Sequence, residues 1–298
     1  MVAELQGRRV LVTGAGRGLG RAHALAMAAE GAAVVVNDTG AELDGTGLSR
    51  EPADAVAAVI SATGGLAFTS HHDVATHDGA AEAVAYAEEV LGGLDAVVNS
   101  AGVLRDRTFA KMSLDDFDAV VRVHLGAAAY TTHAAWPALA RSGSGRVVVT
   151  SSASGLYGQF GQANYAAAKM GLVGLVNVLK QEGARHGVLV NAIAPVAATR
   201  MTIPLLPAEV TAGIAPELVS PVVVHLVSAS CVDTGLVLEV GGGVVAAVRV
   251  VESEPVPLGD SAGAAVAALR DAPPGAPFPS SAAAVERVLA AGSRAAVR

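Results

Sequence analysis

The chain has few aromatic residues and very few lysines. Aromatic side chains make up 3% of its 298 residues, and only three residues are lysines. It contains a single cysteine, Cys231, which excludes a framework of internal disulfide bonds and suits a reducing compartment. The net charge of −7 argues against nucleic acid as the main partner.

Long uninterrupted apolar runs are also absent from the sequence. Although 52% of the residues are hydrophobic, no run free of charges and turn residues reaches the ~20 residues that span a bilayer. The opening residues, "MVAELQGRRVLVTGAG", lead into a strand-like segment and lack the pattern of a signal peptide. The closing residues, "AAVR", do not match a peroxisomal signal. We therefore expect a cytoplasmic protein without a membrane span.

Short runs rich in valine and isoleucine alternate with longer alanine-rich stretches. Near-continuous apolar runs of strand length are typical of parallel sheets that are buried on both faces. Strands that alternate with helices indicate an α/β fold, here a doubly wound, seven-stranded parallel sheet (Rossmann fold) in residues 1–243. The predicted strands cover residues 8–13, 32–38, 66–74, 94–102, 145–152, 188–195 and 235–243.

The pattern changes after residue 243. Two Pro- and Gly-rich segments, "ESEPVPLGDSAG" and "RDAPPGAPFPSS", flank short alanine-rich stretches. We expect residues 244–298 to form a C-terminal extension that packs on the main domain or on a partner subunit; a partly ordered tail is the alternative.

A cluster of glycines joins the first predicted strand to the first helix. Gly14, Gly18 and Gly20 have the spacing GxxxGxG, with Arg17 and Leu19 between them. Glycine lets the backbone turn sharply and approach a pyrophosphate, and the N-terminus of the following helix offers N–H groups to phosphates. Together with an acidic residue at the end of the next strand, this cluster predicts dinucleotide binding.

That acidic residue is Asp38, and it bears on the choice of cofactor. A carboxylate there can accept hydrogen bonds from the ribose hydroxyls of NAD and repels the 2′-phosphate of NADP. Two unit charges ~4 Å apart interact by roughly 4 kcal/mol at an effective dielectric constant of ~20. Arg17 favours the opposite choice, because its guanidinium can pair with that phosphate. We predict NAD, with NADP as the less favoured cofactor.

The third and fourth predicted strands end in further candidate cofactor contacts. Asp73, in "HHDV", can accept a hydrogen bond from the adenine amino group. In "NSAG", Asn99 can tie neighbouring strand ends together and Gly102 leaves space for the cofactor. The candidates in these two segments are Asp73, Val74, Asn99, Ala101 and Gly102.

Ser152, Tyr165 and Lys169 form a candidate catalytic set. Tyr165 follows Ser152 by 13 residues, and Lys169 lies four residues further along a predicted helix, on the same face as the tyrosine. A free tyrosine has a pKa of about 10, and a nearby ammonium shielded from water favours its phenolate. Ser152 can hydrogen-bond a substrate oxygen, so the set suits proton transfer at oxygen while hydride moves at carbon. We expect no metal site.

These motifs resemble the short-chain dehydrogenase/reductase family over roughly residues 5–243. The matching pieces are "TGAGRGLG", "NSAG", Ser152, "YAAAK" and "NAIAPVAATRMT". Longer blocks, including "VVVNDTG", "VLRDRTFAKMS", "VRVHLGAAAYTTHAAW" and "LEVGGG", are similar to the (3R)-hydroxyacyl-CoA dehydrogenase unit of peroxisomal multifunctional enzymes type 2, also known as 17β-hydroxysteroid dehydrogenase type 4.

The resemblance implies a role for each residue of the candidate catalytic set. Tyr165 is implied as the general acid/base, Lys169 as its activator and a cofactor ligand, and Ser152 as the anchor of the substrate oxygen. Pro195 and Thr199 are implied beside the nicotinamide.

Several residues depart from the family pattern. Many family members have Asn at the position of His124, where it ends a lysine–water proton relay; here His124 either holds that water or only fills space in its helix. If it takes part, we expect it to titrate near its reference pKa of ~6.5. Ser100 and Val196 also differ from the common pattern, and Arg17 replaces a small residue.

The sequence leaves three functions open. The first is NAD-dependent oxidation or reduction of a (3R)-hydroxyacyl-CoA or a hydroxysteroid. The second is an NADPH-dependent reductase of 3-oxoacyl-(carrier protein) or of a small ketone, which predicts a basic residue in place of Asp38. The third is a non-catalytic dinucleotide-binding scaffold, in which one or more residues of the Ser/Tyr/Lys set are usually replaced.

We expect a homodimer or homotetramer built through residues 114–140 and 163–186, whose helices have more than one apolar face.

Overall fold

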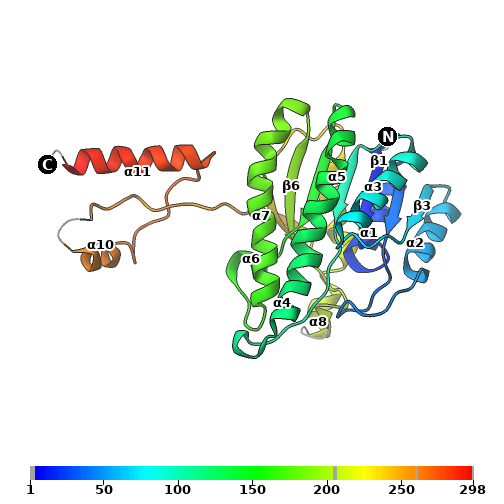
Figure 1. Ribbon diagram of the computed structural model, residues 1–298, viewed down its shortest axis with the longest axis horizontal. Coiled ribbons are helices and arrows are strands. Elements are labelled where there is room, and N and C mark those ends of the chain that lie inside the picture. Colours follow the sequence, from blue (N-terminus) through cyan, green and yellow to red (C-terminus); the bar gives the residue numbers. More distant parts are fainter. Residues whose placement is uncertain (1–3, 204–206, 259–260, 297–298) are drawn as a thin grey trace. The chain divides into compact units, whose positions relative to one another are not determined.

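The computed structural model describes residues 4–203, 207–258 and 261–296. Its internal contacts divide the chain into two compact units, Met1–Ala247 and Val248–Arg298. The larger unit holds one sheet with helices on both faces, as predicted for a doubly wound α/β fold (Figure 1).

The sheet has eight strands in the order β3-β2-β1-β4-β5-β6-β7-β8. All strands from β1 to β7 pair in parallel, and β8 pairs antiparallel with β7. The order reverses between β1 and β4, which is where open α/β sheets bind ligands at the carboxyl ends of their strands. The strands are β1 (Arg9–Thr13), β2 (Ala33–Asn37), β3 (Leu66–Ser70), β4 (Ala96–Asn99), β5 (Arg146–Thr150), β6 (Leu189–Val196), β7 (Val237–Gly241) and β8 (Val244–Ala247).

The eighth strand is a difference from the predicted seven-stranded parallel sheet. Gly242 and Gly243 both have positive φ, 57° and 79°, and form a tight turn that sends β8 back along β7. Two consecutive residues in this conformation are typical of a two-residue β-hairpin, and glycine adopts it without strain. All four residues of β8 are exposed.

Helices cover both faces of the sheet and bury its valines. One face packs against α1 (Gly18–Ala29), α2 (Glu51–Ala62) and α9 (Ser220–Val227), and the shared core includes Val12, Val36, Met27 and Val223. On the other side α5 (Ala127–Arg141) lies beside α3 (His77–Leu91) and α7 (Ala163–Gly183) (Figure 1). The sequence forms helices here because its alanine-rich stretches favour helix and because Thr76 and Ser113 cap helix N-termini through their side chains.

Shorter helical segments complete the larger unit. The helix α4 (Leu114–Val121) runs into α5 through a π-helical turn, η2 (Arg122–Gly126). π-helical turns inside α-helices are frequent at functional sites. The remaining segments are α6 (Ala153–Tyr157), α8 (Ala208–Ala212) and the 3₁₀ turns η1 (Phe109–Lys111), η3 (Ala184–His186) and η5 (Pro216–Leu218).

One apolar stretch, Glu209–Val227, is long and hydrophobic enough to span a membrane by composition, with a mean hydropathy of 1.6. In the structure it is divided among α8, η5 and α9, and Val223 and Val227 of α9 are buried in the core. A core helix of a globular domain passes the same composition test, so this stretch is weak support for a membrane span.

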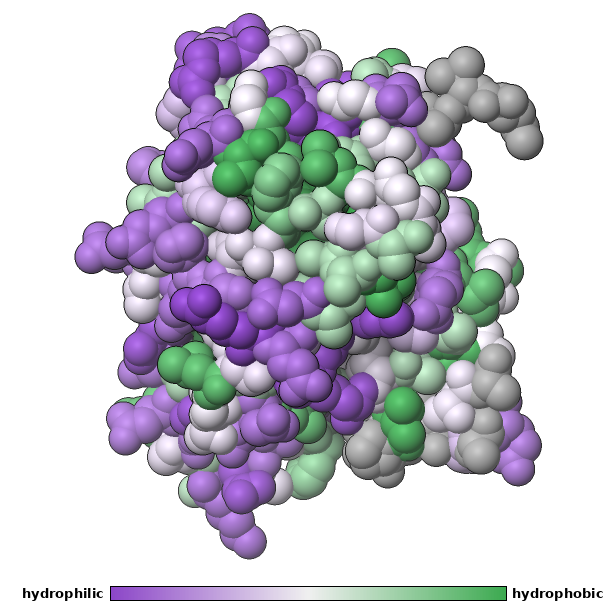
Figure 2. All heavy atoms as spheres, turned by 90° about the vertical axis from the view of Figure 1, so that its right-hand side faces the viewer, coloured by the Kyte–Doolittle hydropathy of each residue, from purple (hydrophilic) through white to green (hydrophobic). Residues whose placement is uncertain are grey.

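The face of the larger unit on the β3 side is largely hydrophilic, with apolar side chains in separate groups (Figure 2).

The smaller unit contains α10 (Ala262–Ala268) and α11 (Ser281–Ala296). Arg287 of α11 forms ion pairs with Glu252 at 3.7 Å and Glu254 at 3.4 Å, donates to the Ser253 carbonyl and lies over the Phe278 ring. Residues 248–298 therefore have internal contacts of their own, and whether they pack on the larger unit or on a partner stays a prediction.

Candidate active site

A cavity of the larger unit lies at the carboxyl ends of β1, β2 and β4. It has a volume of about 350 Å³ and is lined by residues of the glycine loop, the β2 end and the segment after β4. Of the predicted cofactor contacts, those that line it are Gly14, Arg17, Gly18, Leu19, Gly20, Asp38, Asp73, Val74, Ala101, Gly102 and Thr199.

The glycine loop approaches its neighbours too closely for larger residues. Gly14 has a φ of 63°, and a Cβ atom added there would lie 2.6 Å from Ala101 Cα. Gly18, with a φ of 54°, starts α1 and lies against the Thr199 side chain. Because the first N–H groups of a helix have no partner within it, this loop presents the N-terminus of α1 to the cavity. The cradle fits a dinucleotide pyrophosphate.

Asp38 is held against the glycine loop by backbone donors. Its Oδ2 accepts a hydrogen bond from Gly16 N at 2.8 Å, and its Oδ1 accepts one from Gly40 N at 2.7 Å. The carboxylate is thus fixed at the end of β2, where a ribose hydroxyl of a bound dinucleotide lies in this fold class.

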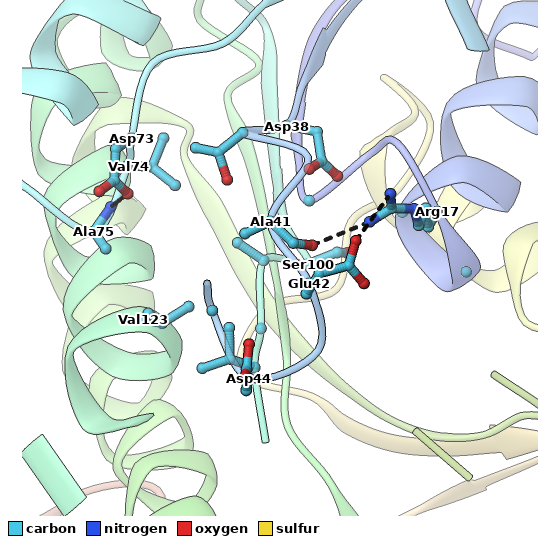
Figure 3. A pocket seen from close by; sticks show the side chains of 18 of the residues that line it. Arg17, Asp38, Ala41, Glu42, Asp44, Asp73, Val74, Ala75, Ser100 and Val123 are labelled. Carbon is cyan, nitrogen blue, oxygen red and sulfur yellow. Dashed lines mark hydrogen bonds and ion pairs between the residues drawn. The ribbon is translucent and has the colours of Figure 1, made fainter. Parts of the chain in front are cut away.

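Arg17 is engaged by the segment that follows Asp38. Its Nη1 donates to the Ala41 carbonyl at 3.0 Å, and its Nη2 lies 4.0 Å from Glu42 Oε1 (Figure 3). Arg200 donates to the same carbonyl at 3.3 Å. Burial lowers the pKa of Arg200, and the charge of Arg17 adds to this effect. The two guanidinium groups therefore lie close together at one wall of the cavity.

The segment after β2, residues 38–48, lines one side of the cavity, a feature that the sequence analysis missed. Leu104 N donates to the Leu43 carbonyl at 2.9 Å, and Arg105 Nε donates to the Asp44 carbonyl at 2.9 Å. These bonds connect the segment after β2 with the segment after β4. The sequence signal was the unusual length of this glycine-containing connection. Further lining residues that the sequence analysis did not name are Thr39, Ala41, Glu42, Asp44, Gly45, Leu48, Arg105, Arg122, Val123, Arg200 and Met201.

Four predicted cofactor contacts do not line this cavity, namely Asn99, Pro195 and the catalytic candidates Tyr165 and Lys169. Asn99 is buried, and its Nδ2 donates to Thr132 Oγ1 at 3.2 Å. It therefore connects β4 to α5, whereas the sequence analysis expected it to connect neighbouring strand ends. Pro195 lies in β6 and pairs in register with Val240 of β7.

The candidate catalytic residues meet beside the cavity at the start of α7. Tyr165 follows Asn164, whose Oδ1 accepts from Tyr165 N at 2.8 Å and whose Nδ2 donates to the Arg105 carbonyl at 3.1 Å. Ser152 follows β5, caps α6 and lies close enough to the Tyr165 phenol to lower its pKa. Lys169 is buried, with Nζ donating to the Thr150 carbonyl at 2.5 Å and lying 5.4 Å from the centre of the Tyr165 ring.

Burial affects the tyrosine and the lysine in opposite directions. Burial raises the pKa of Tyr165, although the nearby Ser152 hydroxyl opposes that shift. Burial lowers the pKa of Lys169 to about 7. The phenolate and the ammonium are each unfavourable alone in this site, and each stabilises the other.

His124 lies on the π-helical turn η2 and contacts the same tyrosine. Its ring is 4.9 Å from the Tyr165 ring, nearly perpendicular to it. Nε2 lies 2.7 Å from the Val103 carbonyl and 3.2 Å from the Val103 backbone nitrogen, and Nδ1 is buried without a hydrogen-bond partner among the described residues. We assign the proton to Nε2 because the carbonyl, an acceptor, is the closer of its two partners. Burial and then the charge of Lys169 lower the pKa of His124 well below 6.5. The expectation that it titrates near 6.5 is therefore wrong.

Gly102 makes room for this histidine at the cavity wall. A Cβ atom added to Gly102 would lie 2.4 Å from His124 Cε1. The catalytic set is thus connected to the cavity through the residue pair Gly102 and Val103, which line it.

One group of potential metal ligands occurs among the described residues, away from this site. Ligand atoms of His225, Cys231 and Asp233 lie within 4.8 Å of one another. His225 and Asp233 are exposed, and the guanidinium of Arg146 donates to the Cys231 carbonyl. A nearby guanidinium repels a cation, so we assign no metal to this group.

The comparisons with known proteins agree with this geometry. Residues 8–209 match the family model described as short chain dehydrogenase. The mouse peroxisomal multifunctional enzyme type 2 is 46% identical over 82% of this chain, which spans about a third (33%) of that enzyme. A hydroxyacyl-CoA dehydrogenase of Mycobacterium tuberculosis is 44% identical over 67% of this chain and 64% of its own length. The crystal structure of a short chain dehydrogenase from Mycobacterium avium, 43% identical, superposes with a TM-score of 0.78 and covers 92% of this chain and 99% of its own.

Proposed function

The chain belongs to the short-chain dehydrogenase family, and on that premise we propose that it catalyses NAD-dependent hydride transfer between the cofactor and a (3R)-hydroxyacyl-CoA thioester. Members of the family are oxidoreductases that act on CH–OH groups and bind a nicotinamide dinucleotide. The observation that carries the proposal is the Tyr165 phenol with Ser152 beside it and with Nζ of buried Lys169 5.4 Å from the centre of its ring. A scaffold that only bound the dinucleotide would not need this buried set.

Each residue of the set has one task in alcohol oxidation. A bound nicotinamide supplies the acceptor for the hydride. Ser152 donates a hydrogen bond to the substrate oxygen, and Tyr165 removes the hydroxyl proton. Lys169 stabilises the phenolate that this transfer requires, and Nδ1 of His124 can accept a hydrogen bond from a water beside it. In the reverse direction, Tyr165 returns its proton to the substrate oxygen as hydride arrives at carbon.

The charges around the cavity support NAD over NADP. Asp38 is fixed by two backbone donors, and Glu42 and Asp44 add two carboxyl groups to the lining. Arg17 is engaged with Ala41 and Glu42, so its guanidinium is partly neutralised. A 2′-phosphate bound at the end of β2 would be repelled by the fixed carboxylate of Asp38.

A basic and aromatic rim supports a CoA thioester over a steroid. Arg107, Phe109, Lys111 and Phe160 are all exposed, and Arg107 N donates to the Gly161 carbonyl at 2.9 Å, which places these residues near one another. Arginine and lysine bind phosphates, and aromatic faces stack on an adenine ring. CoA carries both groups, whereas a steroid carries neither.

The test measures oxidation of (3R)- and (3S)-hydroxyacyl-CoA and of a hydroxysteroid with NAD and with NADP. We expect the (3R)-thioester with NAD to give the highest kcat/KM. Tyr165→Phe should reduce kcat by ~10²-fold or more, as expected for loss of an acid/base group, and leave NAD binding nearly unchanged. Residual activity above about a tenth of wild type would contradict the role of the phenol.

Two further variants separate the cofactor and substrate parts of the proposal. Asp38→Ala should narrow or reverse the preference for NAD, since the carboxylate that repels the 2′-phosphate is lost. An unchanged ratio of kcat/KM with NAD to kcat/KM with NADP would mean that Asp38 does not face the ribose.

The double variant Arg107→Glu/Lys111→Glu should raise KM for the CoA thioester and leave KM for the matching pantetheine thioester unchanged. Arg185→Glu, exposed on η3 before β6, is the control. Equal effects on both thioesters would exclude the rim as the nucleotide site.

A further inference from the structure

Asp106 has a carboxyl group that the mechanism above does not use. Its Oδ2 accepts a hydrogen bond from Gln162 Nε2 at 2.7 Å. Its Oδ1 is buried and has no hydrogen-bond partner among the described residues. A buried carboxylate oxygen without a donor costs free energy. Asp106 therefore does not serve mainly to stabilise the fold.

The segment that carries Asp106 is fixed alongside the residues that precede Tyr165. Arg107 N donates to the Gly161 carbonyl, and Arg107 forms an isolated β-bridge with Gln162. On the other side of Asp106, the Arg105 carbonyl accepts from Asn164 Nδ2 at 3.1 Å. Because both neighbours are anchored, the position of Asp106 relative to the start of α7 is well defined.

Four polar or charged side chains act on the Tyr165 phenol. Lys169 of α7 and Ser152 before α6 favour the phenolate. His124 of η2 is neutral in its buried site. Burial raises the pKa of Tyr165, and the negative charge of Asp106 adds to this rise while Ser152 opposes it.

Two arginines flank Asp106, but neither guanidinium pairs with its carboxylate in the described hydrogen bonds and ion pairs. Arg105 pairs with Asp116 at 3.2 Å, and the exposed Arg107 donates to the Asp106 backbone carbonyl at 3.0 Å. The charge of Asp106 thus remains available to act on the phenol. It is the acidic counterpart of Lys169 in this site.

We propose that Asp106, held by Gln162, is a positioning residue that opposes Lys169 at the phenol and keeps Tyr165 in its acid form. This inference rests on the proposed role of Tyr165 as the acid/base group. A protonated phenol is ready to give a proton to a ketone, whereas alcohol oxidation needs the phenolate. With Asp106 present, oxidation should therefore begin at a higher pH than it would without this charge. Reduction should remain active up to a higher pH, closer to neutrality.

The test is the pH dependence of both directions in Asp106→Asn, which keeps the shape of the side chain and an oxygen for Gln162. We expect the apparent pKa that controls oxidation to fall by about one unit, as for loss of a nearby like charge. On the acid side of that limb, kcat/KM for oxidation should rise by up to about tenfold, because one pKa unit changes the phenolate fraction tenfold there. Reduction should begin to decline at correspondingly lower pH.

The controls separate this local effect from a general change in charge. Asp106→Glu restores the charge and should return the profile toward wild type. Asp118→Asn removes an exposed carboxylate from the neighbouring α4 and should leave the profile unchanged. If Asp106→Asn does not fold, Asp106→Ser is used in its place. Equal shifts in Asp106→Asn and Asp118→Asn would overturn the proposal.

A second readout does not depend on activity. The ultraviolet titration of Tyr165 is obtained as the difference between a protein and the same protein carrying Tyr165→Phe. This titration should occur at lower pH in Asp106→Asn than in the wild-type protein. If the titration moves and catalysis does not respond, the acid/base role of Tyr165 fails while the inference on Asp106 stands. If a folded Asp106→Asn has the wild-type titration, the inference is wrong.

Discussion

At the scale of single residues, the buried charges near Tyr165 determine which groups titrate during catalysis. His124 carries its proton on Nε2, which faces the Val103 carbonyl, and its pKa lies well below 6.5 because of burial and Lys169. A histidine in this state can accept a hydrogen bond through Nδ1 but does not gain a proton near neutral pH. Its task, if it takes part, is to orient the relay.

We therefore predict that His124 does not contribute to the acid limb of the pH–rate profile. His124→Asn should keep substantial activity and the same limb, because an amide oxygen can replace Nδ1 as an acceptor. His124→Ala should lower kcat more than it raises KM, since proton transfer is disturbed and binding is not. A wild-type limb near the reference pKa of ~6.5 that disappears in His124→Asn would contradict this assignment.

Lys169 has a cost for stability that its catalytic task requires. Its pKa is lowered to about 7 by burial, so between that pH and its ordinary pKa the unfolded chain binds a proton that the folded chain does not. Stability then rises with pH across this window. The cost of the buried ammonium is fully present below pH 7 and disappears as pH approaches the ordinary lysine value of about 10.4.

Replacing this lysine should consequently stabilise the inactive protein. Lys169→Met keeps the length of the side chain and removes the charge, although it also removes the hydrogen bond to the Thr150 carbonyl. We expect a net gain of ~1–3 kcal/mol in the free energy of unfolding at neutral pH, given ~1.4 kcal/mol for each pKa unit, and a smaller gain at pH 9.5. Urea unfolding at both pH values measures it. A variant that is less stable than wild type at pH 7 would show that the ammonium is favourably solvated.

The sequence predicts the residues of this site better than their ionisation. The spacing of Ser152, Tyr165 and Lys169 places two of them a helical turn apart and the third at a strand end, which local geometry explains. The effect of Asp106 depends on residues 105–107 lying along residues 161–164, segments more than 50 positions apart. Which nitrogen of His124 carries the proton depends on the Val103 carbonyl, which lies in the segment after β4. Contacts of this kind have no local signal.

At the scale of elements, the parallel strands and their helices follow from apolar periodicity. The family resemblance agrees with this prediction of the fold. What the sequence analysis missed are the elements whose geometry departs from regular periods. The π-helical turn η2 inserts an extra residue into a helix that otherwise reads as continuous, and β8 is too short and exposed to have the apolar run of a core strand. The position of residues 38–50 beside the cavity is fixed by hydrogen bonds to their backbone carbonyls, such as those of Leu43 and Asp44, from residues distant in the sequence.

The β7–β8 hairpin provides the prediction at this scale. Non-glycine residues in the left-handed region cost about 1–2 kcal/mol each, so replacing Gly242 and Gly243 together by alanine should destabilise the protein measurably in urea. Amide exchange in β8 should increase most. Gly242→Asn is the matched control, because Asn-Gly is a favoured pair in two-residue hairpins. A double alanine variant as stable as Gly242→Asn would mean that the turn is not formed in solution.

At the scale of the whole molecule, the helices beside the sheet leave apolar side chains in solvent. On α7, Met170 is 40% exposed and Val178 is 51% exposed, and exposed Gly174 lies between them at the same four-residue interval. Residues at this spacing share one face of a helix. The face is apolar and lies away from the buried valines of the same helix. It suits close contact with a helix of a second copy.

We predict that the protein is a homo-oligomer that uses this face of α7 together with α5, which lies beside it (Figure 1). Light scattering should give a mass that is a multiple of the 29.5 kDa chain at micromolar concentration. Met170→Arg/Val178→Arg should reduce that mass, because burying two unpaired guanidinium groups in an interface is unfavourable. Val59→Arg, at a valine of α2 that is 43% exposed, is the control and should leave the mass unchanged. A variant ending at Ala247 tests the alternative that the extension joins the subunits. On that alternative, the variant should have a lower mass than the wild-type oligomer although its α7 is intact. A wild-type species of single-chain mass would rule out the oligomer altogether.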